Sequence, residues 1–429
     1  MIRFAVVLVA VLAVPAFAQS GGGVAAQTGG VSLSEDGRSR LHLGLDAGVG
    51  FDTNPYTTPL ASGQFAGDVT ARVRPYLEVN APGSLLTFTS KGQLDYGFLP
   101  GVIDEETQNF LLYQSAISAD LEVNRGGMFT FAMGDTVSWN NDPGVAVIGS
   151  QLNRVNNQLR AGVGWTPGGG ALQMRLGYTF GFLKYIDFEN NGGIIGQGEL
   201  DTMSHGLQLR ADYRFLPKTG VFATLGAGFQ NYPFTDTQGF AVPVGVSVGL
   251  QGNVLPKVAG LVSLGYSNPL TFDTSGALTT GAVFGLVGQI EAQWAATPMT
   301  AISGGFQRKF DPIALYGYVA ASRFYGALSQ TLLGRFAFSA NAGYSVLEFG
   351  AEQSSQELTD AAVGRLDGHL DAGLRASYFF FDWFSVGISN VTDWRLTNAN
   401  DVSSVAEGGD PLNLGYVRNE TLLLASVRY

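Results

Sequence analysis

Polar and apolar residues alternate along much of the chain with a period of two. Over residues 68–80 the even positions, from Asp68 to Asn80, are polar or charged apart from Tyr76, whereas the odd positions, from Val69 to Val79, are apolar. Successive side chains of a β-strand point to opposite faces of the sheet, so such a segment has one polar face and one apolar face. The pattern returns over residues 86–98 and 154–165, and it predicts long strands.

The segments between these strands are of two kinds. Eight are short and rich in residues that favour turns: 81–83, 124–127, 166–170, 216–220, 253–257, 296–299, 332–334 and 380–383. Nine are longer and polar: 53–67, 99–107, 140–152, 188–201, 231–239, 268–276, 311–316, 350–362 and 398–411. Together they predict about eighteen strands, within a range of sixteen to twenty. Short turns at one end and long loops at the other are typical of a bacterial outer-membrane barrel.

Composition supports a fold that crosses a membrane with strands. Only 14% of the residues are charged, against roughly 25% in an ordinary soluble domain. Hydrophobic residues make up 45% of the chain, which excludes a disordered protein. Lipid offers no partner to backbone N–H and C=O groups, so a sheet in the membrane must close on itself. We therefore predict an all-β fold, a transmembrane antiparallel β-barrel over residues 41–429. A soluble β-sandwich or propeller is the alternative, although its strands are usually shorter.

Aromatic residues support lipid around the sheet, because they gather where strands are predicted to end, as in the interfacial girdles of such barrels. They are Trp139, Trp165, Trp294, Trp383, Tyr178, Tyr266, Phe215 and Phe310.

The N-terminus has the features of a secretory signal peptide. Arg3 precedes a short apolar run, and the sequence Ala16-Phe17-Ala18 fits a cleavage site. We predict Sec-type export with cleavage after Ala18, a flexible periplasmic leader over 19–40, and the outer membrane of a Gram-negative cell as the destination. The chain contains no cysteine, so it cannot form disulfides in the periplasm.

The C-terminus ends in a strand pattern that closes on an aromatic residue. Leu423, Ala425, Val427 and Tyr429 stand at a spacing of two. This ending resembles the signal by which the barrel assembly machinery recognises outer-membrane barrels, and we expect these four residues to serve that role.

Strand parity also predicts which side chains line the interior. The candidate solute path consists of polar residues on that face: Arg72, Arg74, Lys91, Arg154, Arg160, Arg175, Arg210, Arg214, Arg323, Arg335, Arg365, Arg375, Tyr76 and Asp95. Barrels of sixteen to eighteen strands are wide enough for an aqueous channel. Rows of arginine can guide anionic solutes. Alternatively, the arginines pair with acids on neighbouring strands and stiffen the wall.

Catalytic and metal chemistry have little support in the sequence. The three histidines, His42, His205 and His369, are too scattered to form a metal set. His369 stands between Asp367 and Asp371 on one predicted face, but no matching nucleophile or oxyanion site accompanies it. No nucleotide-binding loop or basic surface patch is present, which excludes nucleic acid as a partner. We expect neither an enzyme nor a bound cofactor or metal.

Residues 43–56, with the corner Phe51-Asp52-Thr53-Asn54, resemble the opening hairpin of the putative outer-membrane beta-barrel porins. Val73-Arg74-Pro75-Tyr76-Leu77 and Leu94-Asp95-Tyr96 are similar to the next two strands of that family. The specific match covers about 60 residues. The chain resembles relatives that act as the outer-membrane barrel component of Wzx/Wzy-type polysaccharide secretion. This resemblance implies an exit pore that receives its polymer from a periplasmic polysaccharide export protein.

Three functions remain open at this point. The first is the exit of a secreted polysaccharide of exopolysaccharide, capsule or spore-coat type. The second is a general or selective diffusion porin for small solutes. The third is a structural or receptor barrel whose lumen is plugged by its own leader or loops.

Overall fold

The computed structural model describes residues 31–34, 38–55, 57, 60, 67–83, 85–99, 110–112, 114–140, 153–186, 200–234, 239–278, 285–313, 317–350, 365–398, 400–401, 412–413 and 415–429. The predicted signal peptide, residues 1–18, and most of the predicted leader lie outside these residues.

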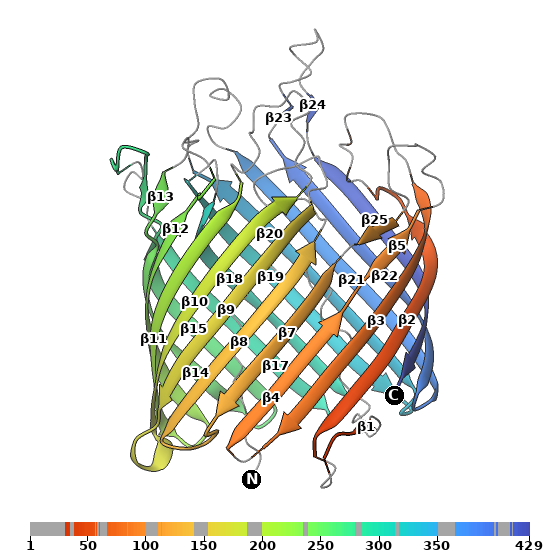
Figure 1. The fold of residues 1–429 in the computed structure, drawn as a ribbon, viewed down its shortest axis with the longest axis horizontal. Helices are drawn as coiled ribbons and strands as arrows, with labels where there is room; N and C mark the ends of the chain where they lie inside the picture. Colours follow the sequence, from red (N-terminus) through yellow and green to blue (C-terminus); the bar gives the residue numbers. More distant parts are fainter. Residues whose placement is uncertain are drawn as a thin grey trace.

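Eighteen antiparallel strands form a closed barrel (Figure 1). Two of these barrel strands are each made of two shorter strands, β4 with β5 and β6 with β7. In order they are β2 (Arg40–Asp52), β3 (Asp68–Pro82), β4 (Leu86–Gln93) with β5 (Tyr96–Phe98), β6 (Phe110–Leu112) with β7 (Ser115–Val123), β8 (Phe129–Asn140), β9 (Asn153–Trp165), β10 (Leu172–Ile186), β11 (Thr202–Leu216), β12 (Thr219–Asn231), β14 (Val244–Leu255), β15 (Val258–Asn268), β17 (Leu286–Thr297), β18 (Thr300–Ile313), β19 (Gly317–Leu332), β20 (Phe336–Phe349), β21 (Leu366–Phe381), β22 (Phe384–Thr397) and β25 (Tyr416–Arg428). The predicted fold class and number of strands are confirmed.

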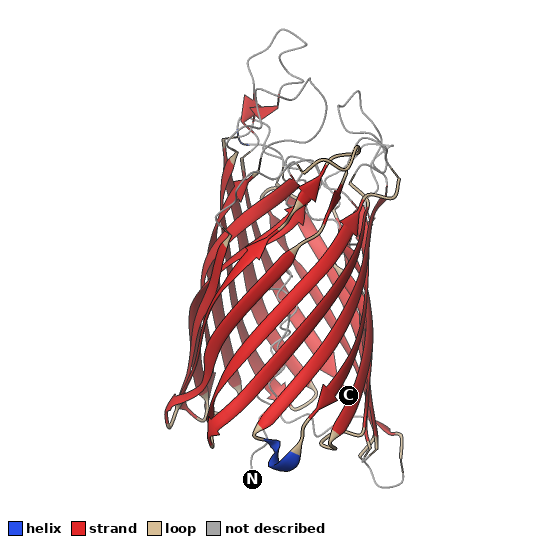
Figure 2. Cartoon of the chain, turned by 90° about the vertical axis from the view of Figure 1, so that its left-hand side faces the viewer, coloured by secondary structure: helices blue, strands red, loops and turns tan. Residues whose placement is uncertain are grey.

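Five short strands in the described ranges lie beyond the barrel strands. They are β1 (Val31–Ser32), β13 (Phe240–Ala241), β16 (Thr271–Phe272), β23 (Asn400–Asp401) and β24 (Leu412–Asn413), and a 3-10 turn, η3, covers Gly168–Gly170 (Figure 2). Two of the short strands, β23 and β24, pair with each other in a separate sheet. No helix among the described residues is long and apolar enough to cross a membrane.

The first and last strands of the barrel pair with each other. β2 and β25 run antiparallel, with Gly44 opposite Arg428 and Asp52 opposite Glu420. At the end of this seam the backbone N–H of Tyr429 donates to the carbonyl of Leu43, and the N–H of Leu43 donates to the carbonyl of Tyr429, at 2.8 and 3.0 Å. β1 and the C-terminus both lie at the end of the barrel that carries the short turns (Figure 1).

The two faces of each strand differ in the way that the alternation predicts. On β14, Val246, Val248 and Leu250 are at least half exposed on the isolated barrel, whereas Ser247 lies between them on the inner face. Exposed apolar side chains occur at every second position of most strands around the ring. An apolar exterior around a polar interior is the arrangement that a lipid bilayer requires.

Three details differ from the prediction. The segment 86–98, predicted as one strand, is split into β4 and β5 at Leu94 and Asp95, opposite Pro75 of β3. Proline has no N–H to donate, so the ladder is interrupted there. The barrel strand that follows the loop predicted at 268–276 begins only at Leu286, and the described part of the segment before it contains the short strand β16. Tyr178, expected near a strand end, lies in the middle of β10.

Candidate transport lumen

The interior of the barrel has one wall built from ion pairs. On β3, Arg72 is 4% exposed and its guanidinium pairs with Asp95 at 3.3 Å and with Glu420 of β25. Arg74 pairs with the same Asp95 carboxylate at 2.9 Å. The predicted path residues Arg72, Arg74 and Asp95 therefore form one cluster, and its charges are compensated within the protein.

These ion pairs reach over intervening strands. β2 lies between β3 and β25, so the side chain of Arg72 crosses β2 to reach Glu420, and it does so beside Gly48 and Gly50, which carry no side chain. Arg375 of β21 approaches Asp46 of β2 at 3.9 Å across β22 and β25. Below these bridges, Leu422 and Leu424 face inward and are only 2% and 3% exposed. We call the inner faces of β25, β2 and β3 the ionic wall.

The same construction recurs elsewhere in the barrel. Arg323 of β19 pairs with Asp371 of β21 at 2.8 Å, over Gly343 of the strand between them. A Cβ atom at Gly343 would lie 2.3 Å from the guanidinium and 2.9 Å from the carboxylate, so only glycine leaves room for this pair. Arg160 and Asp120 approach to 3.7 Å across β8, where Gly134 plays the equivalent part.

The remaining predicted path residues differ in their contacts. Arg210 is held by Asp212 at 2.8 Å and lies over the ring of Phe222, while Lys91 pairs with Glu78 at 3.3 Å on an exposed part of the wall.

Within the described part of the chain no carboxylate lies within 4.0 Å of four further cations, Arg154, Arg175, Arg214 and Arg335. Arg335 lies in the turn after β19, not on a strand. The ring of Tyr76 crosses the place where Gly44 would carry a side chain.

At the mouth that carries the long loops, one buried carboxylate joins two strands. Asp367, fully buried, accepts hydrogen bonds from Arg365 at 2.8 Å and from Arg395 of β22 at 2.7 Å. The guanidinium of Arg365 also lies 4.0 Å from the ring of Phe349. These hydrogen bonds tie the segment that leads into β21 to β22 at the mouth.

The opposite wall carries no charge. On the described strands β12, β14 and β15 the inner face consists mainly of glycine, serine, threonine and glutamine, among them Thr224, Gly226, Gly245, Ser247 and Ser263. These residues are partly exposed, unlike the buried inner residues of β25. We call the inner faces of β12, β14 and β15 the neutral wall. β14 stands nine strands from β2 in a ring of eighteen, so the two walls face each other.

His369 has a different partner from the one predicted. Its Nε2 lies 2.8 Å from Asp393 of β22, whereas Asp371 pairs with Arg323 and Asp367 with two arginines. Among the described residues no group of three histidine, aspartate or glutamate side chains is placed to hold a metal ion.

Several wall residues were missed by the sequence analysis. Asp46, Asp393 and Arg395 each complete an ion pair of the interior. Strand parity could have found them, because Asp46 stands between the outward-facing Leu45 and Ala47.

Acidic and phenolic groups at the loop end of the barrel have shifted pKa values. Burial raises the pKa of Tyr232, just after β12, to about 12. Burial also raises the pKa of Asp201. The backbone N–H of Tyr185 donates to this carboxylate at 2.8 Å and lowers the pKa, but the effect of burial is larger. In the loop after β16, hydrogen bonds from Ser275 and Ala277 lower the pKa of Asp273.

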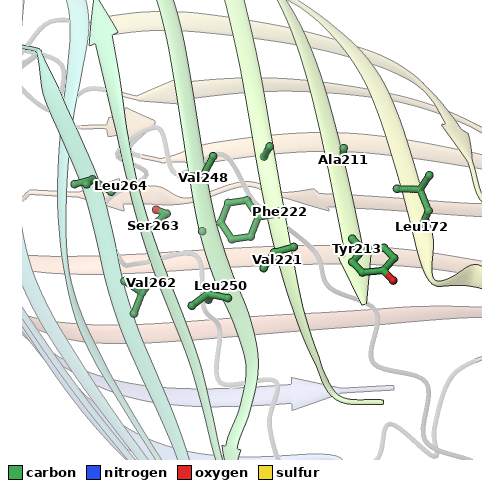
Figure 3. A pocket seen from close by; sticks show the side chains of 12 residues that line it. Leu172, Ala211, Tyr213, Val221, Phe222, Val248, Leu250, Val262, Ser263 and Leu264 are labelled. Atoms are coloured by element: carbon green, nitrogen blue, oxygen red, sulfur yellow. The ribbon is translucent and has the colours of Figure 1, made fainter. Parts of the chain in front are cut away.

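A hollow of about 600 Å³ lies on the outer surface (Figure 3). Its lining is apolar and includes Val248, Leu250, Val262 and Leu264, which are outward-facing residues of β14 and β15. The hollow therefore faces lipid and is not part of the solute path.

An apolar exterior, a closed ring of long strands and a polar interior define an outer-membrane porin-like barrel. The sequence matches the model of the family described as Putative beta-barrel porin 2 over residues 44–404, and the chain belongs to this family. A comparison with curated proteins gave no match.

Solved structures with a similar barrel come from several bacteria. OpdQ of Pseudomonas aeruginosa is 12% identical, with 91% of this chain and 97% of that chain covered and a TM-score of 0.43. The outer membrane channel DcaP of Acinetobacter baumannii is 12% identical, with 93% and 99% covered and a TM-score of 0.39. The FrpB iron transporter of Neisseria meningitidis is 10% identical, with 90% and 82% covered and a TM-score of 0.46. All three scores are below 0.5, so these structures carry no information about what this chain transports.

Proposed function

We propose that this barrel is the outer-membrane exit channel for a secreted polysaccharide. The observation that carries the proposal is the neutral wall, where glycines, hydroxyls and amides line the open side of the lumen. A polyhydroxylated chain can exchange hydrogen bonds with such a wall while it slides. The compensated charges of the ionic wall would hold neither an anionic nor a cationic polymer strongly.

Recognition by the barrel assembly machinery belongs to the same proposal. Leu423, Ala425 and Val427 form the outward face of β25, and Tyr429 is 64% exposed beside the seam. These residues are accessible to a protein that reads the last strand.

A periplasmic polysaccharide export protein would dock at the short turns. Exposed apolar side chains stand on most of them, among them Leu85, Met128, Val254 and Met299, and Leu333 at the tip of its turn is 97% exposed. A ring of such residues suits a protein partner, because covering apolar side chains that are exposed to water lowers the free energy.

The first experiment is deletion of the gene in the parent bacterium. Loss of a surface polysaccharide with unchanged uptake of small solutes supports an exit channel. Normal polysaccharide together with impaired solute uptake contradicts it.

Two adjacent substitutions then test the path itself. Gly226→Trp places an indole in the lumen at a position where a Cβ meets only one atom, at 3.9 Å, and we expect it to reduce export. Ala227→Trp, one residue along and facing lipid, is the matched control and should leave export unchanged. Equal export by both variants would contradict the proposed path.

A diffusion porin is the second candidate, favoured by membership of the porin family. In a planar bilayer a diffusion porin gives large, steady conductance and restores uptake of small solutes to a porin-deficient strain. A barrel plugged by its own chain conducts little and its deletion leaves the cell surface unchanged.

A further inference from the structure

Two groups of polar side chains lie on the outer face of the barrel, where lipid would be expected. On β8 the outward positions include Phe131, Met133 and Val137, all more than 40% exposed, and Asp135 shares their face. Asn157 of β9 donates an amide hydrogen bond to the Asp135 carboxylate at 2.8 Å. We call this pair the acidic patch.

The second group joins β22 and β25. Asn390 donates to Asn419 at 3.0 Å and to Thr421 at 2.8 Å, and Asn419 donates to Thr392 at 2.7 Å. Their strands place these residues on the same outward faces as Ile388 and Leu423, which are 45% and 59% exposed. We call these four residues the amide patch.

Both patches lie inside the apolar band of the membrane. A barrel strand rises about 3.3 Å per residue and tilts by about 35–45°, so each residue climbs about 2.5 Å along the membrane normal. Phe129 and Trp139 bracket the outward face of β8, and Phe384 and Trp394 bracket that of β22, each pair ten residues apart. That spacing equals the band of about 25 Å between the two aromatic girdles.

The two patches also lie at the same depth. Asp135 is six residues above Phe129, and Asn157 is eight residues above Trp165, which pairs with Phe129. Asn390 and Thr392 are six and eight residues above Phe384; Thr421 and Asn419 are six and eight above Val427, which pairs with Phe384. Each patch is therefore centred about 15–20 Å above the girdle at the short-turn end.

The chemistry of the patches is complementary. The Asp135 carboxylate only accepts hydrogen bonds. Within the amide patch the amide N–H groups are used by the patch's own side chains, whereas the hydroxyl of Thr392, which accepts from Asn419, keeps its O–H to donate. A carboxylate in the acyl layer is costly unless a partner covers it. Between the patches stand β2, β3, β4 and β7, whose outward faces include the small residues Ala47, Ala71 and Ala119. Small residues allow close packing in membranes.

We propose that copies of this chain assemble side by side in the membrane, with the acidic patch of one copy against the amide patch of the next. Equal depth is what copies related by rotation about the membrane normal require, because such a rotation leaves depth unchanged. The contact is heterologous, so repeating it generates a ring if the rotation between neighbouring copies closes.

Cysteine cross-linking tests the pairing of the faces, and the native chain contains no cysteine to interfere. Val137→Cys beside the acidic patch and Phe51→Cys opposite Thr421 keep all six patch residues. The double variant should give covalent multimers when oxidised in the outer membrane, while each single variant stays a monomer on denaturing gels. The control pair Val137→Cys with Leu264→Cys on β15, which is 58% exposed, should give none.

Three results would overturn the proposal: no multimers from the first pair, equal multimers from the control pair, or dimers from a single variant. Native mass in mild detergent gives a separate measure. Asp135→Leu should reduce the assembly to single barrels that keep the heat-dependent gel shift of a folded barrel, while Asp135→Asn should retain it. A wild-type protein that is a single copy, or Asp135→Leu with unchanged mass, contradicts the proposal.

Discussion

The ionic wall and the neutral wall face each other across one lumen, yet they are built on different principles. On the ionic wall, charged side chains such as Arg72 and Glu420 reach over a glycine-bearing strand and bury one another. On the neutral wall, Ser247 is hydrogen-bonded to Thr224 of the neighbouring strand, and both Ser247 and Ser263 are partly exposed. One side of the barrel is therefore held together by buried ion pairs, whereas the small side chains of the other side leave space in the lumen.

The largest effect is expected where a buried ion pair is broken. Glu420→Ala leaves Arg72 without one of its carboxylates and should lower the free energy of unfolding by about 3–5 kcal/mol. Ser263→Ala on the neutral wall should cost less than about 1 kcal/mol, because the serine is partly exposed. Urea unfolding of both variants in lipid vesicles measures the difference, and equal losses would remove the distinction between the walls.

A charge placed on the two faces of β14 separates lumen from lipid. Val246→Arg should cost about 2–4 kcal/mol because Val246 faces acyl chains. Ser247→Arg, the next residue, points into the open side of the lumen and should leave folding nearly intact. The same unfolding assay applies. Equal tolerance at the two positions would contradict the assignment of faces.

A carboxylate added to the neutral wall should change the ion selectivity of the channel and have little effect on the free energy of unfolding. Ser263→Asp should shift the reversal potential of the channel toward cation selectivity, because no cation on the described part of that wall compensates it. The shift should shrink in 1 M salt, where the Debye length is about 3 Å. Planar-bilayer recordings at low and high salt provide the measurement, with Ser263→Asn as the control. An unshifted potential would mean that ions take another path.

The smallest effect concerns pH at the loop end of the neutral wall. The folded-state pKa of Tyr232 is raised to about 12, from about 10 in the unfolded chain. The protonated phenol therefore contributes stability that is fully present below pH 10 and declines as the pH rises toward 12. Tyr232→Phe should flatten this part of the stability profile. Thermal unfolding between pH 9 and 12 tests it, and identical slopes for both proteins would argue against a buried phenol.

The sequence predicted the barrel well because its signals are local. Turn residues such as Pro82 and Gly83 mark where strands end, and alternation within each strand separates the two faces. The ion pairs could not be predicted in the same way. Arg72 meets Glu420, and Arg323 meets Asp371, only after the strand register of the closed barrel has brought next-nearest strands together. His369 likewise pairs with Asp393 on the following strand rather than with the aspartates two residues away.

The join between Leu43 and Tyr429 sets a condition on how the molecule is made. On that side β2 and β25 pair with each other, so the edges of both strands stay unpaired until β25 has been delivered. An open edge readily recruits a strand from another chain. During assembly the unpaired edges of β2 and β25 must therefore both be shielded, although β2 is synthesised first and β25 last of the barrel strands. Both edges must then be released at the same time so that they can pair. Removing Tyr429, which makes both backbone hydrogen bonds to Leu43, should prolong the interval in which the two edges are open.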